Sequence, residues 1–415
     1  MFNHFEITNK LKKIKETFLG MVGGGMLMLT CITPLQAGEW KIKGNIYQAL
    51  SYDDNVIMRE TPEASPVYAL TPTLNVSHRT DVSEISANAS YGIQRYLDKT
   101  EFDRENQNYG VSGRYSTENI EWGGVANYSL TPARDTAEQE SGNFSTNSDR
   151  ETFFVSPSVS YQLSELDRLT LSGHYTNTSY STFEDESLTT FDSLNDYVDK
   201  GLNLSWSRRW SELYTSSLNI FYSNYESSGN NGIASNQIKS DSGGANISLT
   251  YFLSEKWELF GTVGGRVTKT KEANGISNTS AGYLIDSGVN YIGESLLAEF
   301  SVKQSLEPSS QGPLNDQLRI SLDLEYKLTE RISISLLNSY QESESVNGNG
   351  DSSNKRKNYT FNPSLSWRLA PDWTLSGSYR YRYQKRPIGA FEETANSNLY
   401  MLSVNYSWPG LSVAR

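Results

Sequence analysis

Near its C-terminal end the chain reads Leu318-Arg319-Ile320-Ser321-Leu322-Asp323-Leu324-Glu325-Tyr326, with an apolar residue at every second position and a polar one between. Successive side chains of a β-strand point to opposite faces, so this period of two predicts a strand with one apolar and one polar face. About ten residues of tilted strand are enough to cross a bilayer. The stretch therefore predicts a strand that can span a membrane.

The same alternation recurs along the chain, for example from Trp40 to Tyr52 and from Leu169 to Thr176. Counting every such segment gives eighteen predicted strands. They are 40–52, 67–78, 82–96, 106–117, 120–131, 152–163, 168–180, 197–209, 213–225, 241–253, 257–268, 280–292, 296–306, 316–328, 332–341, 356–369, 373–383 and 396–408. The fold class is therefore all-β.

The connections between these segments alternate in length. Tight turns, as at Ser164 to Asp167 and Thr329 to Arg331, alternate with long polar loops, as at Pro132 to Arg150 and Glu342 to Lys355. Short periplasmic turns and long outer loops are typical of bacterial outer-membrane barrels. The pattern predicts a transmembrane antiparallel up-and-down β-barrel of eighteen strands, with the N- and C-termini in the periplasm.

Composition and aromatic placement favour the same architecture. The mean hydropathy is −0.55, and the chain has 26 Tyr and 31 Gly, which does not suit several stacked apolar cores. Aromatic residues such as Trp210, Trp257 and Trp373 flank the short turns, and others such as Tyr52, Tyr68 and Tyr381 lie near the long loops. Amphipathic rings at both edges of an apolar band are expected of a membrane barrel.

The first 37 residues have the pattern of a secretory signal peptide. Lys10 to Lys15 is basic, Phe18 to Ile32 is apolar, and Ala37 precedes the expected cleavage site. We expect residues 38–415 to form the mature barrel as one domain. The one cysteine, Cys31, falls inside the leader, so thiolate chemistry is excluded from the mature chain.

Removal of that leader takes away four Lys and two Glu and moves the formal charge from −12 to −14. This acidic balance argues against nucleic acid as a partner.

Three prolines interrupt predicted strands, in the similar settings Thr71-Pro72-Thr73, Ser156-Pro157-Ser158 and Asn362-Pro363-Ser364. Proline cannot donate a ladder hydrogen bond, and a closed barrel has no free edge that could accept the loss. We therefore expect β-bulges at these positions.

A barrel of eighteen strands encloses more space than side chains can fill, so a lumen follows from its geometry. The residues on the polar face line it and are mostly Ser, Thr and Asn, among them Ser205, Asn219, Asn246, Ser321 and Asn362. Such a wall suits hydrated solutes of little charge, although any barrel needs a polar interior.

Charges on that face are sparse and nearly balanced, which indicates cross-strand pairs. Arg380 and Arg382 share one inward face, so together with Arg319 they are candidates for a constriction, the alternative being structural pairing.

An enzyme is not favoured. The mature chain has two histidines, His78 on the lipid-facing parity and His174 on the inward parity without a recognisable partner. The cluster Asp53-Asp54-Asn55 lacks the ligand spacing of a calcium loop, so neither a metal site nor a cofactor is expected.

Three motifs carry a family resemblance. Tyr52-Asp53-Asp54-Asn55-Val56 after the first strand, Pro157-Ser158-Val159-Ser160-Tyr161 and the turn Leu163-Ser164-Glu165 resemble the outer-membrane β-barrel porins encoded beside exopolysaccharide (capsule or biofilm polysaccharide) genes. The resemblance implies an eighteen-stranded barrel that passes a secreted polysaccharide across the outer membrane with a periplasmic export protein. It brings no catalytic or ligand residues.

The chain departs from this resemblance at its C-terminal tail, Pro409 to Arg415, which follows the expected terminal aromatics Tyr406 and Trp408.

The expectation is a Gram-negative outer-membrane porin for polysaccharide secretion, with membrane lipids and the barrel-assembly machinery as further partners. A general diffusion porin or small-solute channel is the alternative.

Overall fold

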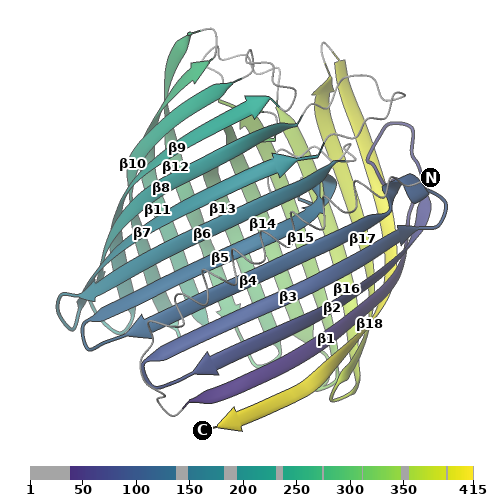
Figure 1. The fold of residues 1–415 in the computed structure, drawn as a ribbon, viewed down its shortest axis with the longest axis horizontal. Helices are drawn as coiled ribbons and strands as arrows, with labels where there is room; N and C mark the ends of the chain where they lie inside the picture. Colours follow the sequence, from purple (N-terminus) through teal and green to yellow (C-terminus); the bar gives the residue numbers. More distant parts are fainter. Residues whose placement is uncertain are drawn as a thin grey trace, which may run out of the picture.

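The computed structural model describes residues 38–136, 148–181, 194–229, 237–272, 275–310, 312–346, 355–388 and 391–414. They form one closed antiparallel barrel (Figure 1). Its eighteen strands are β1 (Glu39–Asp53), β2 (Ser65–Arg79), β3 (Ser83–Tyr96), β4 (Arg104–Ser116), β5 (Ile120–Pro132), β6 (Asp149–Gln162), β7 (Asp167–Tyr180), β8 (Asn195–Arg209), β9 (Tyr214–Gly229), β10 (Ile238–Ser254), β11 (Trp257–Glu272), β12 (Ser277–Ile292), β13 (Leu296–Glu307), β14 (Asn315–Lys327), β15 (Ile332–Ser345), β16 (Arg356–Ala370), β17 (Trp373–Ile388) and β18 (Phe391–Ala414).

Each strand pairs with its neighbours in sequence, and β1 also pairs with β18, which closes the ring. All eighteen predicted segments are confirmed, and most strands run a few residues further toward the long loops than predicted. Two short 3-10 helices lie in these loops, η1 (Thr100–Phe102) and η2 (Ala133–Asp135). In the described part of the chain, no helix is long and apolar enough to cross a membrane.

The barrel has two unlike rims. Glu39 pairs with both Arg79 and Ala414, so the start of β1 and the end of β18 lie at the rim of the tight turns, which we call the short-turn rim. Figure 1 shows these two ends side by side. The opposite end is the long-loop rim. The predicted signal peptide, residues 1–37, lies outside the described residues.

The bulges expected at the three prolines are absent, so that prediction is wrong. On either side of Pro72, the pairs Leu70–Ile93 and Thr73–Ser90 keep the same register, and only the two positions between them leave the ladder. At Pro157 and Pro363, two positions likewise leave the ladder while the register on either side stays the same. Proline removes one donor but adds no residue, so the strands stay in register.

The backbone oxygen of Gly173, which lies opposite Pro157, accepts a hydrogen bond from another group. The Ser156 hydroxyl donates to the Gly173 oxygen at 2.9 Å. A side chain from the neighbouring residue thus takes the place of the missing backbone donor at this ladder position.

A true bulge closes the barrel instead. Ile42 pairs with Leu411 but Gly44 pairs with Trp408, so two residues of β18, Pro409 and Gly410, oppose one residue of β1. Gly410 has a φ of +87°, the left-handed region that favours glycine. The C-terminal tail therefore belongs to the last strand through Ala414.

This bulge also keeps the apolar face continuous. Before it, Leu402 and Trp408 share a face with Leu50 and Gly44, and after it Leu411 shares the same face with Ile42. A one-residue shift reverses which face each side chain takes, so the bulge matches the change of parity in the sequence. The tail residues Leu411 and Val413 thereby remain on the outer wall.

Aromatic pairs occupy both ends of this outer wall. Near the short-turn rim, ring centroids are 4.5 Å apart for Trp40 and His78 and 4.7 Å apart for Trp257 and Tyr291. Toward the long-loop rim, Tyr379 and Tyr400 are 5.2 Å apart. His78 thus faces outward as predicted.

Candidate functional site: the barrel interior

Hydroxyl groups from adjacent strands pair across the inner wall. Each pair joins two residues whose neighbours on the same strand point outward, so the paired groups belong to the inner face. The pairs are Ser86–Ser112, Thr152–Thr178, Ser160–Thr170, Ser240–Thr270, Ser242–Thr268, Ser248–Thr262, Ser301–Ser321, Ser335–Ser364 and Ser366–Ser376, at 2.6–3.2 Å.

The predicted lining residues extend this polar wall. Ser205 lies opposite Asn219, and Asn219 lies opposite Asn246 and donates to its side-chain oxygen at 2.8 Å. Ser321 pairs with Ser301 at 2.7 Å, and Asn362 lies opposite Leu337. All five predicted residues are partly exposed.

Toward the long-loop rim the inward side chains are buried. Inward residues from strands around the ring are buried there, and several are completely inaccessible. The buried set includes Asp53, Val67, Tyr96, Arg104, Thr152, Thr178, Asn195, Tyr197, Tyr225, Ser242, Arg266, Thr268, Gln317, Gln341, Asn358, Arg382, Gln384 and Ser397. We call this level the inner layer. The inward side chains are therefore partly exposed toward the short-turn rim and buried toward the long-loop rim.

The connection between β1 and β2 folds inward as part of this layer. Val56 and Ile57 pack with Val67, Tyr96 and Phe102. Met58, fully buried at a φ of +50°, packs against Ala395 of β18. Apolar side chains in a surface loop would gain nothing in water, so burial inside the barrel stabilises the inward path.

Polar contacts fix the same connection. The Asn55 amide donates to the backbone oxygens of Arg59 at 2.7 Å and Asn396 at 2.9 Å, and Asp53 accepts from the Asn55 backbone at 3.0 Å. Lys99 and Glu63 form an ion pair at 2.6 Å, and Glu63 raises the pKa of Lys99. The connection is therefore tied to both β18 and the β3–β4 connection.

The helix η2 contacts two apolar groups of the inner layer. The first is the group of Val56, Tyr96 and Phe102, and the second contains Tyr180. The Arg134 guanidinium lies 5.0 Å from the Tyr96 ring centroid and 5.4 Å from that of Phe102, and it donates to the Tyr96 hydroxyl at 2.7 Å. Its neighbour Ala133 packs in the second group with Tyr180. Arg134 is 4% exposed, so these contacts hold a desolvated cation.

The connection between β13 and β14 supplies another part of the inner layer. We call this connection the tip; the structure describes its residues 308–310 and 312–314. Pairing between β12 and β13 ends at Ile285 and Gln304, although β13 continues to Glu307. The tip reaches β8 and β9: the Tyr225 hydroxyl donates to the backbone oxygens of Gly312 at 2.8 Å and Ser309 at 3.3 Å.

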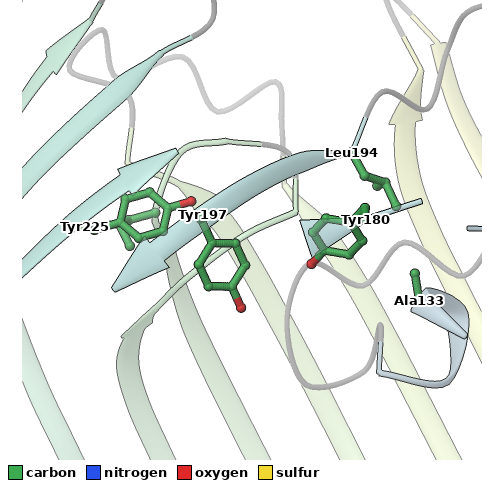
Figure 2. Packing of buried hydrophobic residues seen from close by; sticks show 6 residues of the cluster. Ala133, Tyr180, Leu194, Tyr197 and Tyr225 are labelled. Carbon is green, nitrogen blue, oxygen red and sulfur yellow. The ribbon is translucent and has the colours of Figure 1, made fainter. Parts of the chain in front are cut away.

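Two further contacts hold the tip. The backbone N–H of Asn195 donates to the backbone oxygen of Ser310 at 2.7 Å, and Arg266 forms an ion pair with Asp316. Figure 2 shows Tyr225, Tyr197 and Tyr180 following one another toward Leu194 and Ala133. Tyr225 of β9 thus bonds the tip directly, and Tyr197 of β8 and Tyr180 of β7 belong to the same buried cluster.

The structure separates Arg319 from the other two proposed constriction arginines. Arg382 is 9% exposed and forms an ion pair with Asp53 at 2.8 Å, and the Ser397 hydroxyl also donates to Asp53. Arg380 follows on the same inward face, opposite Leu399. Arg319 lies three strands away on β14, opposite Lys303 and Gln341.

His174 has a partner that the sequence did not reveal, so the expectation of none is wrong. Its Nε2 lies 2.9 Å from Asp199 Oδ2, and the two residues occupy the inner faces of β7 and β8. Among the described residues, no three His, Cys, Asp or Glu side chains gather as a metal site.

Sequence reasoning also missed the residues of the inner layer. Val56, Ile57 and Met58 are a short apolar run inside an otherwise polar connection, and that run was the available signal. For the tip between β13 and β14, the two apolar residues Leu306 and Leu314 were a comparable signal. Neither signal indicates by itself whether the connection folds into the barrel or away from it.

Comparison with known families bears on this barrel. Residues 34–196 match the family model described as "Putative beta-barrel porin 2". This N-terminal part of the chain is thus similar to that family. The match covers the part of the chain that contains the Tyr52-Asp53-Asp54-Asn55-Val56 and Leu163-Ser164-Glu165 motifs. A comparison with curated proteins gives no match.

The solved structures that are similar to this chain include the following two. The FrpB iron transporter from Neisseria meningitidis, in its apoprotein form, is 9% identical over 89% of this chain and 81% of that chain, with a TM-score of 0.49. The ferric preacinetobactin receptor BauA from Acinetobacter baumannii is 10% identical over 88% and 80%, with a TM-score of 0.46.

Proposed function

We propose that this barrel is a porin that exports a polysaccharide across the outer membrane of a Gram-negative bacterium, with its short-turn rim in the periplasm. The observation that carries the proposal is the inner wall of paired hydroxyl and amide groups, as at Asn219 and Asn246. Such groups exchange hydrogen bonds with the hydroxyls of a sugar polymer at little net cost, as they do with water. A strongly charged wall would instead hold counter-ions.

The difference between the two halves of the interior supports export over import. The lining residues Ser205 and Asn219 are partly exposed in the half toward the short-turn rim, whereas the inward side chains of the other half are buried. A polymer handed over by a periplasmic export protein would enter the more exposed half first. The connections that fold into the barrel would then have to move for passage.

The general diffusion porin is the alternative. It needs a passage that is open at rest, and the connections that fold into the barrel disfavour this. These connections are held by hydrogen bonds such as that from Tyr225 to Gly312, so their displacement requires a driving force such as an entering polymer.

Deletion of the gene tests the proposal. We expect loss of surface polysaccharide while the cell continues to synthesise the polymer, measured by surface labelling and by sugar analysis of cell extracts. Unchanged surface polysaccharide in the deletion strain would refute the export role. An uptake porin would instead give a growth defect on one carbon source.

Paired substitutions test the path through the lumen. In the complemented strain, Ser205→Trp and Asn219→Trp should reduce export, because they narrow the lumen. The matched changes Leu204→Trp and Ile220→Trp, next to them on the outer face, should leave export intact. Equal effects from both pairs would contradict passage through the barrel.

A further inference from the structure

A patch of lysines lies on the outer wall below the long-loop rim. Lys200, Asn224, Asp241 and Lys269 face each other in register across β8 to β11, on the same face as Tyr175. One row nearer the rim, Lys239 pairs in register with Lys271. We call these four exposed lysines the lysine patch. Among the described residues, the carboxylates in register with them are Asp241 and Glu226.

The lysine patch differs from other cations of this rim. Lys385 pairs with Glu392 at 2.7 Å, Lys357 pairs with Glu342 at 3.8 Å, and Lys355 also pairs with Glu342. In the described chain, Lys200, Lys269 and Lys271 make no ion pair within 4.0 Å, and only Lys239 has one, with Glu226 at 3.2 Å. With four lysines and two carboxylates, the described part of the patch therefore retains net positive charge.

Asp241 orders the centre of the patch. It accepts hydrogen bonds from the Tyr222 hydroxyl at 2.7 Å and the Asn224 amide at 3.0 Å. With its oxygen held by these neutral groups, Asp241 lies between Lys200 and Lys269 without forming an ion pair with either. The two ammonium groups remain available to a ligand on the outer wall.

The outer wall between the patch and the middle of the barrel is apolar, and most of its side chains are small. Gly243 and Ala245 of β10 lie beside Val267 and Gly265 of β11. Bulkier side chains stand on either side, Tyr222 at 52% exposure and Tyr283 at 62%. The surface thus combines cations near the rim with a shallow apolar strip toward the middle of the barrel.

We propose that the lysine patch binds the phosphate groups of lipid A in the outer leaflet, with acyl chains along the strip below. Charge complementarity supports this occupant, since lysines at a membrane surface attract anionic headgroups. The apolar strip begins where the cations end. This order matches a phosphorylated glycolipid, in which the acyl chains begin below the anionic phosphate groups. The inference rests on the proposed function for its orientation, in which the long-loop rim faces outward.

Binding to the purified barrel tests this site. The barrel in neutral detergent is titrated with lipid A and with lipid A freed of its phosphates, and bound lipid is measured by native mass spectrometry. We expect preference for the phosphorylated form. The triple variant Lys200→Gln, Lys269→Gln and Lys271→Gln should bind lipid A about a hundred-fold more weakly, since each basic residue contributes about five-fold.

A matched triple on the other side of the same rim is the control: Lys355→Gln, Lys357→Gln and Lys385→Gln should bind like the parent. Equal loss in both triples, unchanged binding in the first, or equal binding of dephosphorylated lipid A would each overturn the site. Displacement by phosphatidylglycerol at equal concentration would overturn the choice of lipid. Heat-modifiable migration confirms that each variant is folded.

These outcomes are separate from those of the export proposal. The titration uses no polysaccharide, so a loss of lipid A binding in the first triple stands whatever the deletion strain shows. A deletion strain without surface polysaccharide, together with a barrel that ignores lipid A, would overturn the site alone.

Discussion

At the scale of single residues, Gly410 decides how the barrel closes. A Cβ atom at this position would collide with the carbonyl oxygen of Ile42, and the φ of +87° is costly for any other residue. We expect Gly410→Ala to destabilise the barrel by about 1–3 kcal/mol. The temperature at which the folded gel band is lost should fall accordingly.

Gly377→Ala is the matched control for Gly410→Ala. No atom lies within 4 Å of a Cβ at Gly377, and this residue has no positive φ. Its variant should keep the parent's transition temperature. If both variants shift equally, the bulge has no special role in closure.

Arg382 gives a second residue-scale prediction. Its pair with Asp53 is buried, so Arg382→Ala leaves a carboxylate without its cation and should cost about 3–5 kcal/mol. Arg114, whose pair with Glu84 at 3.4 Å is exposed, serves as control, and Arg114→Ala should cost less than about 1 kcal/mol. Comparable losses of thermal stability would contradict the buried pair.

At the scale of elements, the β13–β14 tip is held by few groups. Tyr225→Phe removes the hydroxyl that donates to Ser309 and Gly312, a loss of about 1–3 kcal/mol if the carbonyls stay buried. We expect more frequent opening and higher mean conductance in a planar bilayer. Tyr326→Phe, on the outer wall near the short-turn rim, should leave conductance unchanged.

A disulfide tests the same element in the opposite direction. Asn195→Cys with Ser310→Cys joins positions linked by a backbone hydrogen bond of 2.7 Å. Oxidation should lock the tip and block export, and a reductant should restore it. The control pair Ser333→Cys with Ser366→Cys joins two wall strands already in register, so oxidation there should have no effect. Export through the locked tip would show that this element is not displaced.

At the scale of the whole molecule, the two rims must face different compartments. Epitope tags in the short turns at Glu165 or Glu330 should be reachable only from the periplasm. Tags near Asn143, Asn230 or Asn349, which lie outside the described residues, should label intact cells, because long polar loops tolerate insertions. The reverse accessibility would invert both the export direction and the lipid site.

The sequence by itself determined the strands and their faces. Alternation in Leu318 to Tyr326 is a local property, because the face that a side chain takes depends only on its place in its own strand. For the same reason Ser205, Asn219 and Ser321 could be assigned to the inner wall. The count of eighteen followed from the same pattern.

Only the tertiary structure decided which distant groups meet. Asp53 and Arg382 are 329 positions apart, and His174 meets Asp199 through the register of two strands. The inward path of Val56 to Met58 was equally hidden, since a loop has no period that fixes a direction. Register and loop path depend on all strands at once, because burial against distant partners sets their free energy.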